Sequence, residues 1–253
     1  MLEEILESYK KEKITEEEAE EKILKSFYNE GDSYLLDTNR EKRIGFPEII
    51  YGKSKKLEEI MEIVEETLKE RNIAFISDLN KEKKRKLNQK FSNFNVNQAN
   101  KLMTIKKDNY SPKNLGTVGI ITGGTSDVPY AEEASLLLEE LGVETKKAHD
   151  SGVSGIHRSL VSVKKMEETD LIMVFAGMEG VLPTLVGSIT EKPIIAVPTP
   201  IGYGHGGKGE GALTTMLQSC VPGILVVNIG NVIGATAGAI RILKIKEDKK
   251  WTK

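Results

Sequence analysis

Residues 119–130, GIITGGTSDVPY, decide the fold of the second half of the chain. A short apolar run stops at Gly123 and Gly124, polar residues follow, and an amphipathic segment opens with a proline. This order predicts a strand, a glycine turn, a polar cap and a helix. Glycines let the backbone approach a ligand closely, and free N–H groups at a helix start attract phosphate. The Rossmann spacing and the P-loop lysine-serine pair are both missing. A phosphate-binding turn and an ordinary turn capped by Ser126 or Asp127 are therefore about equally good interpretations.

The composition combines many charged residues with a net charge close to zero and a single cysteine. The chain has 253 residues and a net charge of -2, which gives no electrostatic case for nucleic acid or an anionic membrane as partner. Its one cysteine, Cys220, excludes an intramolecular disulfide and the CxxC spacings of structural zinc sites. The N-terminus is charged from its third residue, and no apolar run approaches the length of a membrane span. We therefore expect a cytoplasmic protein.

The composition changes near Asn114, so we expect two domains, residues 1–114 and 115–253. After this boundary, apolar runs alternate with amphipathic segments, separated by short turns. Such alternation calls for a parallel sheet covered on both faces. The expected fold is α/β, a three-layer αβα sandwich with a flavodoxin-like or Rossmann-like parallel sheet. The expected strands are residues 118–121, 143–148 (at a sheet edge), 171–175, 194–197 and 224–229, and the expected helices lie near 130–141, 156–168, 180–190, 208–220 and 232–245.

The N-terminal domain is expected to be smaller and mostly helical. Thr15 followed by Glu18 forms a capping-box pattern, and apolar residues recur at helical spacing over residues 57–68. Residues 73–76 are a candidate strand, and residues 35–51 read as a loop between helices. The basic run KEKKRK, beginning at Lys81, is typical of the solvated face of a charged helix.

Right-handed crossovers place the strand-to-helix loops of such a sheet at one end, where ligands bind. These loops therefore form a candidate site. The loops expected to lie together are residues 123–127, 150–157, 176–183, 198–208 and 228–234.

Two of these loops carry ionisable groups. Asp150, His157 and Arg158 bring a carboxylate, an imidazole and a guanidinium to one of them. The ordinary alternatives are a histidine that caps a helix and an arginine that faces solvent. Glu179 stands between glycines just after a buried strand, an odd place for a purely solvated carboxylate. Its ordinary alternative is a glutamate favoured by the dipole of a helix start.

The loop that begins PTPIGYGHGGKGEG at Pro198 is too long and too rich in glycine to be a simple connector. We interpret it as a ligand-covering loop, with a flexible lid of no chemical specificity as the alternative. His205 and Lys208 in this loop can meet a phosphate or a carboxylate. Cys220 closes the following helix, and a lone cysteine there is usually an inert packed residue.

Taken together, these motifs resemble a known group of enzymes. GGTSD, SGIHR, the run AGMEGVLPTLVGSITEKPIIAVP and the glycine loop after it are similar to the PurE superfamily of carboxyaminoimidazole ribonucleotide mutases and carboxylases. A closer resemblance is to the LarB family. The segment LDTNREKRIGFPEIIYGK resembles the LarB signature, MEG replaces the alanine-histidine pair of PurE, and MLQSC supplies a cysteine that PurE lacks.

The resemblance implies carboxylation of nicotinic acid adenine dinucleotide at pyridinium C5 by CO2 or bicarbonate, with hydrolysis of its phosphoanhydride to release AMP. This is the first step in making the nickel-pincer nucleotide, the cofactor of lactate racemase. A thiolate from Cys220 would add to the electrophilic ring and make it nucleophilic toward CO2. Glu179 would remove the C5 proton, because a carboxylate in a partly dry loop can have a raised pKa.

The resemblance also implies the remaining site residues. His157, the third catalytic candidate, and Arg158 match the PurE pair and would bind CO2, carboxylate or phosphate. Ser126 and Asp127 would hold the ribose phosphate, and Asp127 is also a candidate ligand of a Mg2+ ion carried by the substrate diphosphate. No organic cofactor is implied. The full set of expected binding residues is Gly123, Gly124, Thr125, Ser126, Asp127, Asp150, Gly155, Arg158, Gly177, Met178, Gly202, Tyr203, Gly204, His205, Lys208, Arg40 and Arg43.

Several points stay open at this stage. Salt bridging within the N-terminal domain is nearly as good an interpretation of Arg40 and Arg43. The family's asparagine-isoleucine-aspartate-asparagine-glycine run is Asn228-Ile229-Gly230-Asn231-Val232 here, which leaves the role of that loop in doubt. A PurE-like aminoimidazole ribonucleotide carboxylase or mutase and a non-catalytic nucleotide-binding module are the alternative functions. A homo-oligomer, from dimer up to octamer, is implied by the resemblance.

Overall fold

The computed structural model describes all residues except 1, 26–27, 31–34, 38–39 and 249–253. The chain divides into two compact units. Unit 1 contains Met1–Asn97 and Lys101–Tyr110, and unit 2 contains Gln98–Asn100 and Ser111–Lys253.

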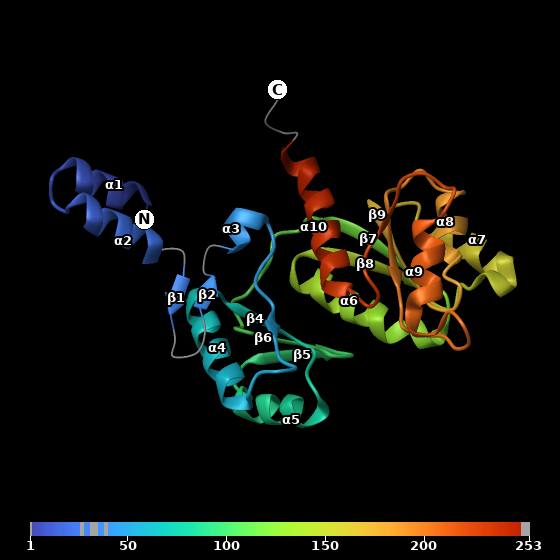
Figure 1. Ribbon diagram of the computed structural model, residues 1–253, viewed down its shortest axis with the longest axis horizontal. Helices are drawn as coiled ribbons and strands as arrows, with labels where there is room; N and C mark the ends of the chain where they lie inside the picture. The colour runs from blue at the N-terminus through green and yellow to red at the C-terminus, as the bar shows by residue number, and fades with distance from the viewer. Residues whose placement is uncertain (1, 26–27, 31–34, 38–39, 249–253) are drawn as a thin grey trace. The chain divides into compact units, whose positions relative to one another are not determined.

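Unit 2 is built on a parallel sheet, as expected (Figure 1). Its strands lie in the order β11-β10-β9-β7-β8, and every neighbouring pair is parallel. Renumbered along the unit, this is the flavodoxin-like order 2-1-3-4-5. The strands are β7 (Gly116–Thr122), β8 (Val143–Ala148), β9 (Leu171–Ala176), β10 (Ile194–Pro198) and β11 (Ile224–Val226).

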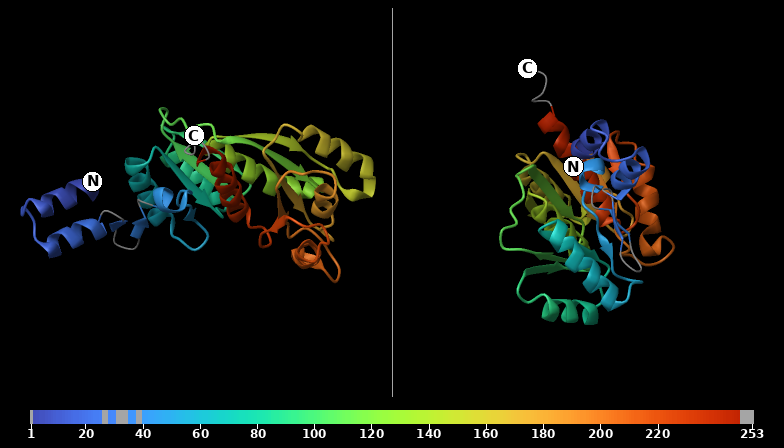
Figure 2. Two further views of the ribbon diagram at one scale, coloured as in Figure 1. Left: turned by 90° about the horizontal axis from the view of Figure 1, so that it is seen from above. Right: turned by 90° about the vertical axis from the view of Figure 1, so that its left-hand side faces the viewer.

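Helices cover both faces of this sheet, which completes the three-layer sandwich (Figures 1 and 2). α6 (Val128–Glu140) and α10 (Val232–Asp248) pack together, while α7 (Ile156–Lys165) packs with α8 (Leu182–Gly187). α9 (Glu210–Leu217) contacts β10 and β11. Short 3-10 turns at Thr125–Asp127, Val153–Gly155 and Gly207–Gly209 precede α6, α7 and α9.

The central strands of unit 2 are apolar along their whole length because both of their faces are covered. Every residue of β9 and β10 is buried. β8, the strand expected at the sheet edge, has four polar residues between Val143 and Ala148, and only these two end residues are buried. Burial on two faces thus explains why the sequence pattern predicted the middle of the sheet most clearly.

Unit 1 contains a second sheet that the sequence indicated only in part. Its strands are β3 (Ile50–Tyr51), β4 (Ile73–Ser77), β5 (Asn95–Ala99) and β6 (Leu102–Lys106), in the order β3-β4-β6-β5. β4 confirms the candidate strand, but β5 and β6 were not predicted. Residues 35–51, expected to be a loop, contain β2 (Leu35–Asp37), α3 (Arg40–Ile44) and β3. The structure corrects that expectation, because strands this short carry too little periodicity to be recognised.

The helices of unit 1 follow the expected pattern more closely. They are α1 (Leu2–Lys10), α2 (Glu16–Lys25), α4 (Leu57–Glu70) and α5 (Lys81–Lys90), and β1 (Tyr28–Glu30) pairs with β2. The capping box before α2 is confirmed, since the Thr15 N–H donates to Glu18 and the Glu18 N–H donates to the Thr15 hydroxyl. Apolar residues of α4, including Ile60 and Val64, pack with β4 in a core of the unit's own. Within the described part of the chain, no helix combines the length and the apolar character of a membrane span.

Candidate functional site

A cavity of about 730 Å3 opens where the strands of unit 2 end. It lies between the loops that follow β7 and β9, where the strand order reverses and ligands of such sheets bind. Loops after β8 and β10 complete the wall, so four of the five loops expected to lie together do so. The lining residues are Gly123, Gly124, Ser126, Asp127, Asp150, Gly152, Val153, Ser154, Arg158, Ala176, Gly177, Met178, Glu179, Gly180, Val181, Leu182, Ile201, Gly202 and Tyr203.

The fifth expected loop, after β11, does not line the cavity. The Gly230 N–H donates to the Pro198 carbonyl, which attaches this loop to the base of its neighbour. Asn231 accepts the Gly234 N–H and so caps the start of α10. The asparagines of this loop therefore have a structural role in the described chain.

Asp127 is the buried centre of the site. Only 4% of it is exposed. One carboxylate oxygen accepts the Thr199 hydroxyl at 2.5 Å and the other accepts the Gly124 N–H at 2.9 Å. Burial raises the pKa of this carboxyl, against the lowering effect of hydrogen bonds from Thr199 and from the N–H groups of Gly124 and Gly177. One side chain therefore ties together the loops after β7, β9 and β10.

In this arrangement the Asp127 carboxylate is engaged with groups of the protein itself. Both oxygens of Asp127 already accept hydrogen bonds from within the protein. The described residues also contain no cluster of three histidine, cysteine, aspartate or glutamate side chains able to hold an ion. Asp127 thus acts as a tie between loops, and its contact with a Mg2+ ion carried by the substrate diphosphate stays a prediction.

The glycine turn lies at the cavity, which Gly123, Gly124 and Ser126 line, and phosphate binding there stays a prediction. Asp127 holds the N-cap position of α6, but its carboxylate accepts the Gly124 N–H and makes no cap bond to the helix. A Cβ built on Gly152 would lie 2.8 Å from the Gly123 carbonyl oxygen, so the loops after β7 and β8 approach too closely for a side chain there.

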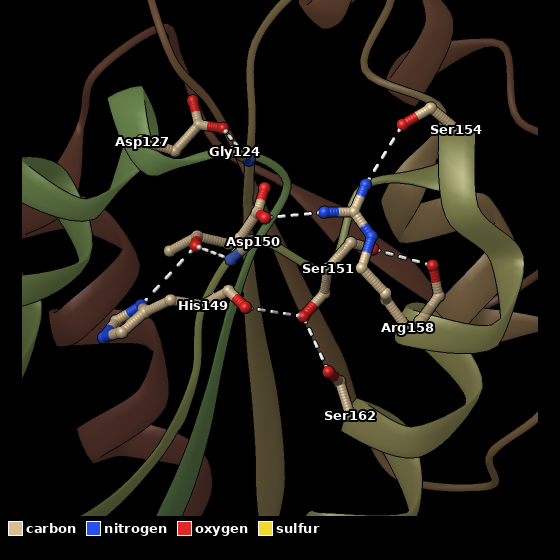
Figure 3. A network of polar contacts seen from close by, with 10 residues as sticks. Gly124, Asp127, His149, Asp150, Ser151, Ser154, Arg158 and Ser162 are labelled. Carbon is tan, nitrogen blue, oxygen red and sulfur yellow. Dashed lines mark hydrogen bonds and ion pairs between the residues drawn. The ribbon is translucent and has the colours of Figure 1, made fainter.

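The loop after β8 places a guanidinium in the cavity wall (Figure 3). Arg158 Nη1 donates to Asp150 at 2.6 Å, and Arg158 Nη2 donates to the Ser154 hydroxyl at 3.2 Å. Asp150 adopts a positive φ of 53°, which a residue other than glycine rarely does. Its backbone N–H is held by the Thr122 hydroxyl at 3.2 Å. Asp150 therefore positions Arg158 and also lines the cavity, and the substrate contact expected of it stays a prediction.

Two further groups support this loop from below, and the sequence did not single them out. His149 Nδ1 lies 3.5 Å from the Thr122 hydroxyl, and its Nε2 lies 3.3 Å from Glu132. The buried hydroxyls of Ser151 and Ser162 are 2.6 Å apart and attach the loop to α7 (Figure 3). The only signal in the sequence was their position beside Asp150, because serine and histidine have no distinctive pattern of their own.

The loop after β9 presents Glu179 on a constrained backbone. Met178 has a φ of 49° and Gly180 a φ of 68°. The Met178 N–H donates to the Ile201 carbonyl at 2.7 Å, which joins this loop to the one after β10. Strain of this kind is common where a backbone must present a functional side chain. Glu179 lines the cavity, but its side chain is exposed and not in the partly dry setting that we expected.

The remaining expected residues do not line the cavity of this chain. Cys220 is exposed and lies between α9 and β11, so it stands where the parallel strands begin. Glu179 stands where they end, and the two groups expected to react together are at opposite ends of one sheet. The expected residues of unit 2 outside the cavity are Thr125, Gly155, His157, Gly204, His205, Lys208 and Cys220.

The two arginines expected to bind substrate belong to α3 in unit 1. Arg43 forms an ion pair with Asp37 inside that unit. This is the salt-bridging alternative that the sequence left open for Arg43.

Comparison with known proteins identifies the class and then the family. Residues 117–253 match the AIR carboxylase family, so unit 2 is an AIR carboxylase domain. Residues 28–107 match the LarB/PurE-like N-terminal domain. The chain therefore belongs to the LarB family, which joins this N-terminal domain to a PurE-like one.

Relatives of two kinds support this assignment. An uncharacterized protein of Methanocaldococcus jannaschii is 42% identical over 96% of this chain and 97% of its own length. N5-carboxyaminoimidazole ribonucleotide mutases match about half of the chain. The mutase of Methanocaldococcus jannaschii is 34% identical over 51% of this chain and 80% of its own, and that of Pyrococcus horikoshii is 35% identical over 51% and 73%. The family is thus one of carboxylases and mutases.

Proposed function

We propose that this protein carboxylates the pyridinium ring of nicotinic acid adenine dinucleotide at C5 and hydrolyses the phosphoanhydride. The products would be pyridinium-3,5-biscarboxylic acid mononucleotide and AMP. The observation that carries the proposal is the match to both LarB-type domains, of which the mutase relatives share only the second. The cavity supports it with an arginine for an anionic group and a carboxylate on a separate loop.

The proposed chemistry uses a thiolate, CO2 and a base in turn. The thiolate of Cys220 adds to the pyridinium ring, which loses its positive charge and its aromaticity and becomes an enamine. C5 of the enamine attacks CO2 and forms the new carbon–carbon bond. Glu179 then takes the proton from C5, and the electron pair expels the thiolate and restores the aromatic cation. In the second reaction, water attacks the phosphorus on the pyridinium side of the phosphoanhydride. The bond from this phosphorus to the bridging oxygen breaks, and AMP leaves with that oxygen.

Because Cys220 and Glu179 lie at opposite ends of the sheet, we propose that each thiolate acts in the cavity of another copy of the chain. Two kinds of exposed apolar surface support such an assembly. Ile189, Leu217 and Leu225 are exposed at or near the end of the sheet that carries Cys220. Ile156, Leu160 and Val161 are exposed on α7, next to the cavity wall. Apolar patches of this kind are typical of subunit contacts.

The function is tested by supplying the dinucleotide, bicarbonate and Mg2+ and measuring AMP and the biscarboxylated mononucleotide by mass spectrometry. Mg2+ is included because it would travel with the substrate diphosphate. We expect both products with the wild type, none detectable with Cys220→Ser, and a loss of roughly 10²–10⁴-fold with Glu179→Gln. Absence of product from the wild type, or full activity in Cys220→Ser, would contradict the proposal.

Co-expression of Cys220→Ser with Glu179→Gln tests whether the two groups come from different copies. If they do, random mixing restores about one quarter of wild-type activity, whereas groups from one copy restore none. The matched control co-expresses wild type with a chain that carries both substitutions. It should retain about one quarter of the activity if the groups come from two copies, and about one half if they come from one.

The mutase relatives favour a second candidate function, the carboxylation of aminoimidazole ribonucleotide. Production of carboxylated aminoimidazole ribonucleotide, at the same rate in Cys220→Ser, would make the protein an enzyme of the kind named by its mutase relatives. Tight binding of the dinucleotide without turnover would instead indicate a nucleotide-binding module.

A further inference from the structure

Tyr203 stands at the rim of the cavity with its side chain in solvent. It is 83% exposed, more than any other large apolar or aromatic residue in the described chain, and yet it lines the cavity. An aromatic ring left in water at the mouth of a site is available to cover a ligand, because stacking removes apolar surface of both partners from water.

The backbone beside Tyr203 is made of glycines with positive φ, 152° at Gly202 and 74° at Gly204. A Cβ at Gly204 would meet nothing within 4 Å, so there is open space on that side of the loop, although the Gly204 carbonyl accepts the Gly207 N–H. The other side is anchored, because the Ile201 carbonyl accepts the Met178 N–H. Tyr203 therefore stands between two backbone hydrogen bonds with open space beside it.

The position of this loop in the sheet indicates which part of a ligand Tyr203 meets. β10, which leads to Tyr203, lies next to β9, which leads to Glu179. β8, which leads to Arg158 and Asp150, lies at the far edge of the sheet. An anionic group bound by Arg158 thus occupies one side of the cavity, and the reacting ring beside Glu179 occupies the side with Tyr203.

We propose that Tyr203 stacks on the pyridinium ring of the substrate and selects it for its positive charge. This inference rests on the proposed function, and it adds a binding residue that the reaction chemistry does not require. The face of a tyrosine ring carries negative electrostatic potential and attracts a cation placed over it. Adduct formation removes the charge from the pyridinium, so the attraction is specific to the ring before the thiolate adds.

The experiment measures binding of two probes that differ mainly in the charge of one ring. Oxidised nicotinamide adenine dinucleotide carries a pyridinium cation, and the reduced form carries a neutral dihydropyridine. Binding is measured by calorimetry with the full chain carrying Cys220→Ser, which prevents covalent addition. Tyr203→Phe and Tyr203→Leu are compared in this background, with Tyr9→Leu on α1 as a control exposed tyrosine.

We expect Tyr203→Leu to weaken binding of the oxidised form by roughly three- to thirtyfold and to leave the reduced form nearly unchanged. Tyr203→Phe should keep most of the affinity, and Tyr9→Leu all of it. Equal losses for both forms, a loss of AMP affinity, no change, or no binding to the starting protein would each overturn the inference. A loss of AMP affinity would place the ring on adenine instead.

These outcomes are separate from those of the proposed function. If wild type makes the carboxylated product and Tyr203→Leu leaves charge selectivity intact, the function stands and the inference fails. If the wild type makes no product, but Tyr203→Leu abolishes the preference for the oxidised ring, the function fails and the inference stands.

Discussion

At the scale of single residues, Asp127 shows how the site is held together from inside. A buried carboxylate is costly to ionise unless it accepts hydrogen bonds, and Asp127 accepts them from Thr199 and from backbone N–H groups. Burial still dominates, and the pKa is raised. The ionised Asp127 carboxylate therefore lowers the stability of the fold, while its hydrogen bonds join three loops.

The raised pKa predicts how stability changes with pH. The folded protein holds the Asp127 proton more strongly than the unfolded chain does, so the stabilisation is present at low pH and is lost as pH rises through the folded pKa. We expect the stability of wild type relative to Asp127→Asn to decrease from about pH 4 toward neutrality. Urea unfolding of both proteins at several pH values measures this difference, and a flat or rising difference would contradict the assignment.

At the scale of elements, the loop after β9 depends on a close approach between a turn and a helix. Gly180 has a φ of 68°, and a Cβ built there would lie 2.6 Å from the Cα of Ala212 in α9. The loop and the helix therefore pack backbone against backbone, with no room for a side chain between them.

We expect Gly180→Ala to lower the free energy of unfolding by roughly 3 kcal/mol, from backbone strain and overpacking combined. Gly223→Ala is the matched control. Gly223 also has a positive φ, of 88°, but its Cβ would meet nothing within 4 Å. Strain alone should cost it about 1 kcal/mol. Equal losses in the two variants, measured by chemical denaturation, would show that the contact with α9 is unimportant.

At the scale of the whole molecule, each unit has an apolar core of its own. Ile60, Val64 and Ile76 belong to the core of unit 1, and Val174 and Ala196 to that of unit 2. Compact units with separate cores are usually able to fold independently.

We therefore expect residues 111–253, expressed alone, to fold and to unfold cooperatively. The parallel sheet and the helices on both of its faces supply the needed burial. Circular dichroism and urea titration of this fragment test the expectation, and a gradual transition without cooperativity would contradict it.

The sequence by itself determined the architecture of unit 2. Long apolar runs such as β9 are typical of strands buried on both faces, and they predict a parallel sheet. Glycine turns such as Gly123-Gly124 indicate where its loops begin. It also determined the family, because each LarB motif is a short contiguous segment that can be recognised in the sequence alone. The sheet of unit 1 was missed, since strands as short as Ile50–Tyr51 leave no period to detect.

Only the tertiary structure decided which of the expected residues share the cavity. His157 and Arg158 are neighbours in sequence, yet only Arg158 lines the cavity, because Asp150 and Ser154 hold its guanidinium there. Cys220 and Glu179 fall at opposite ends of the sheet because all its strands run in one direction, so a loop that leads into a strand and a loop that leaves one cannot meet. Contacts of this kind join residues far apart in the chain, and no local pattern encodes them.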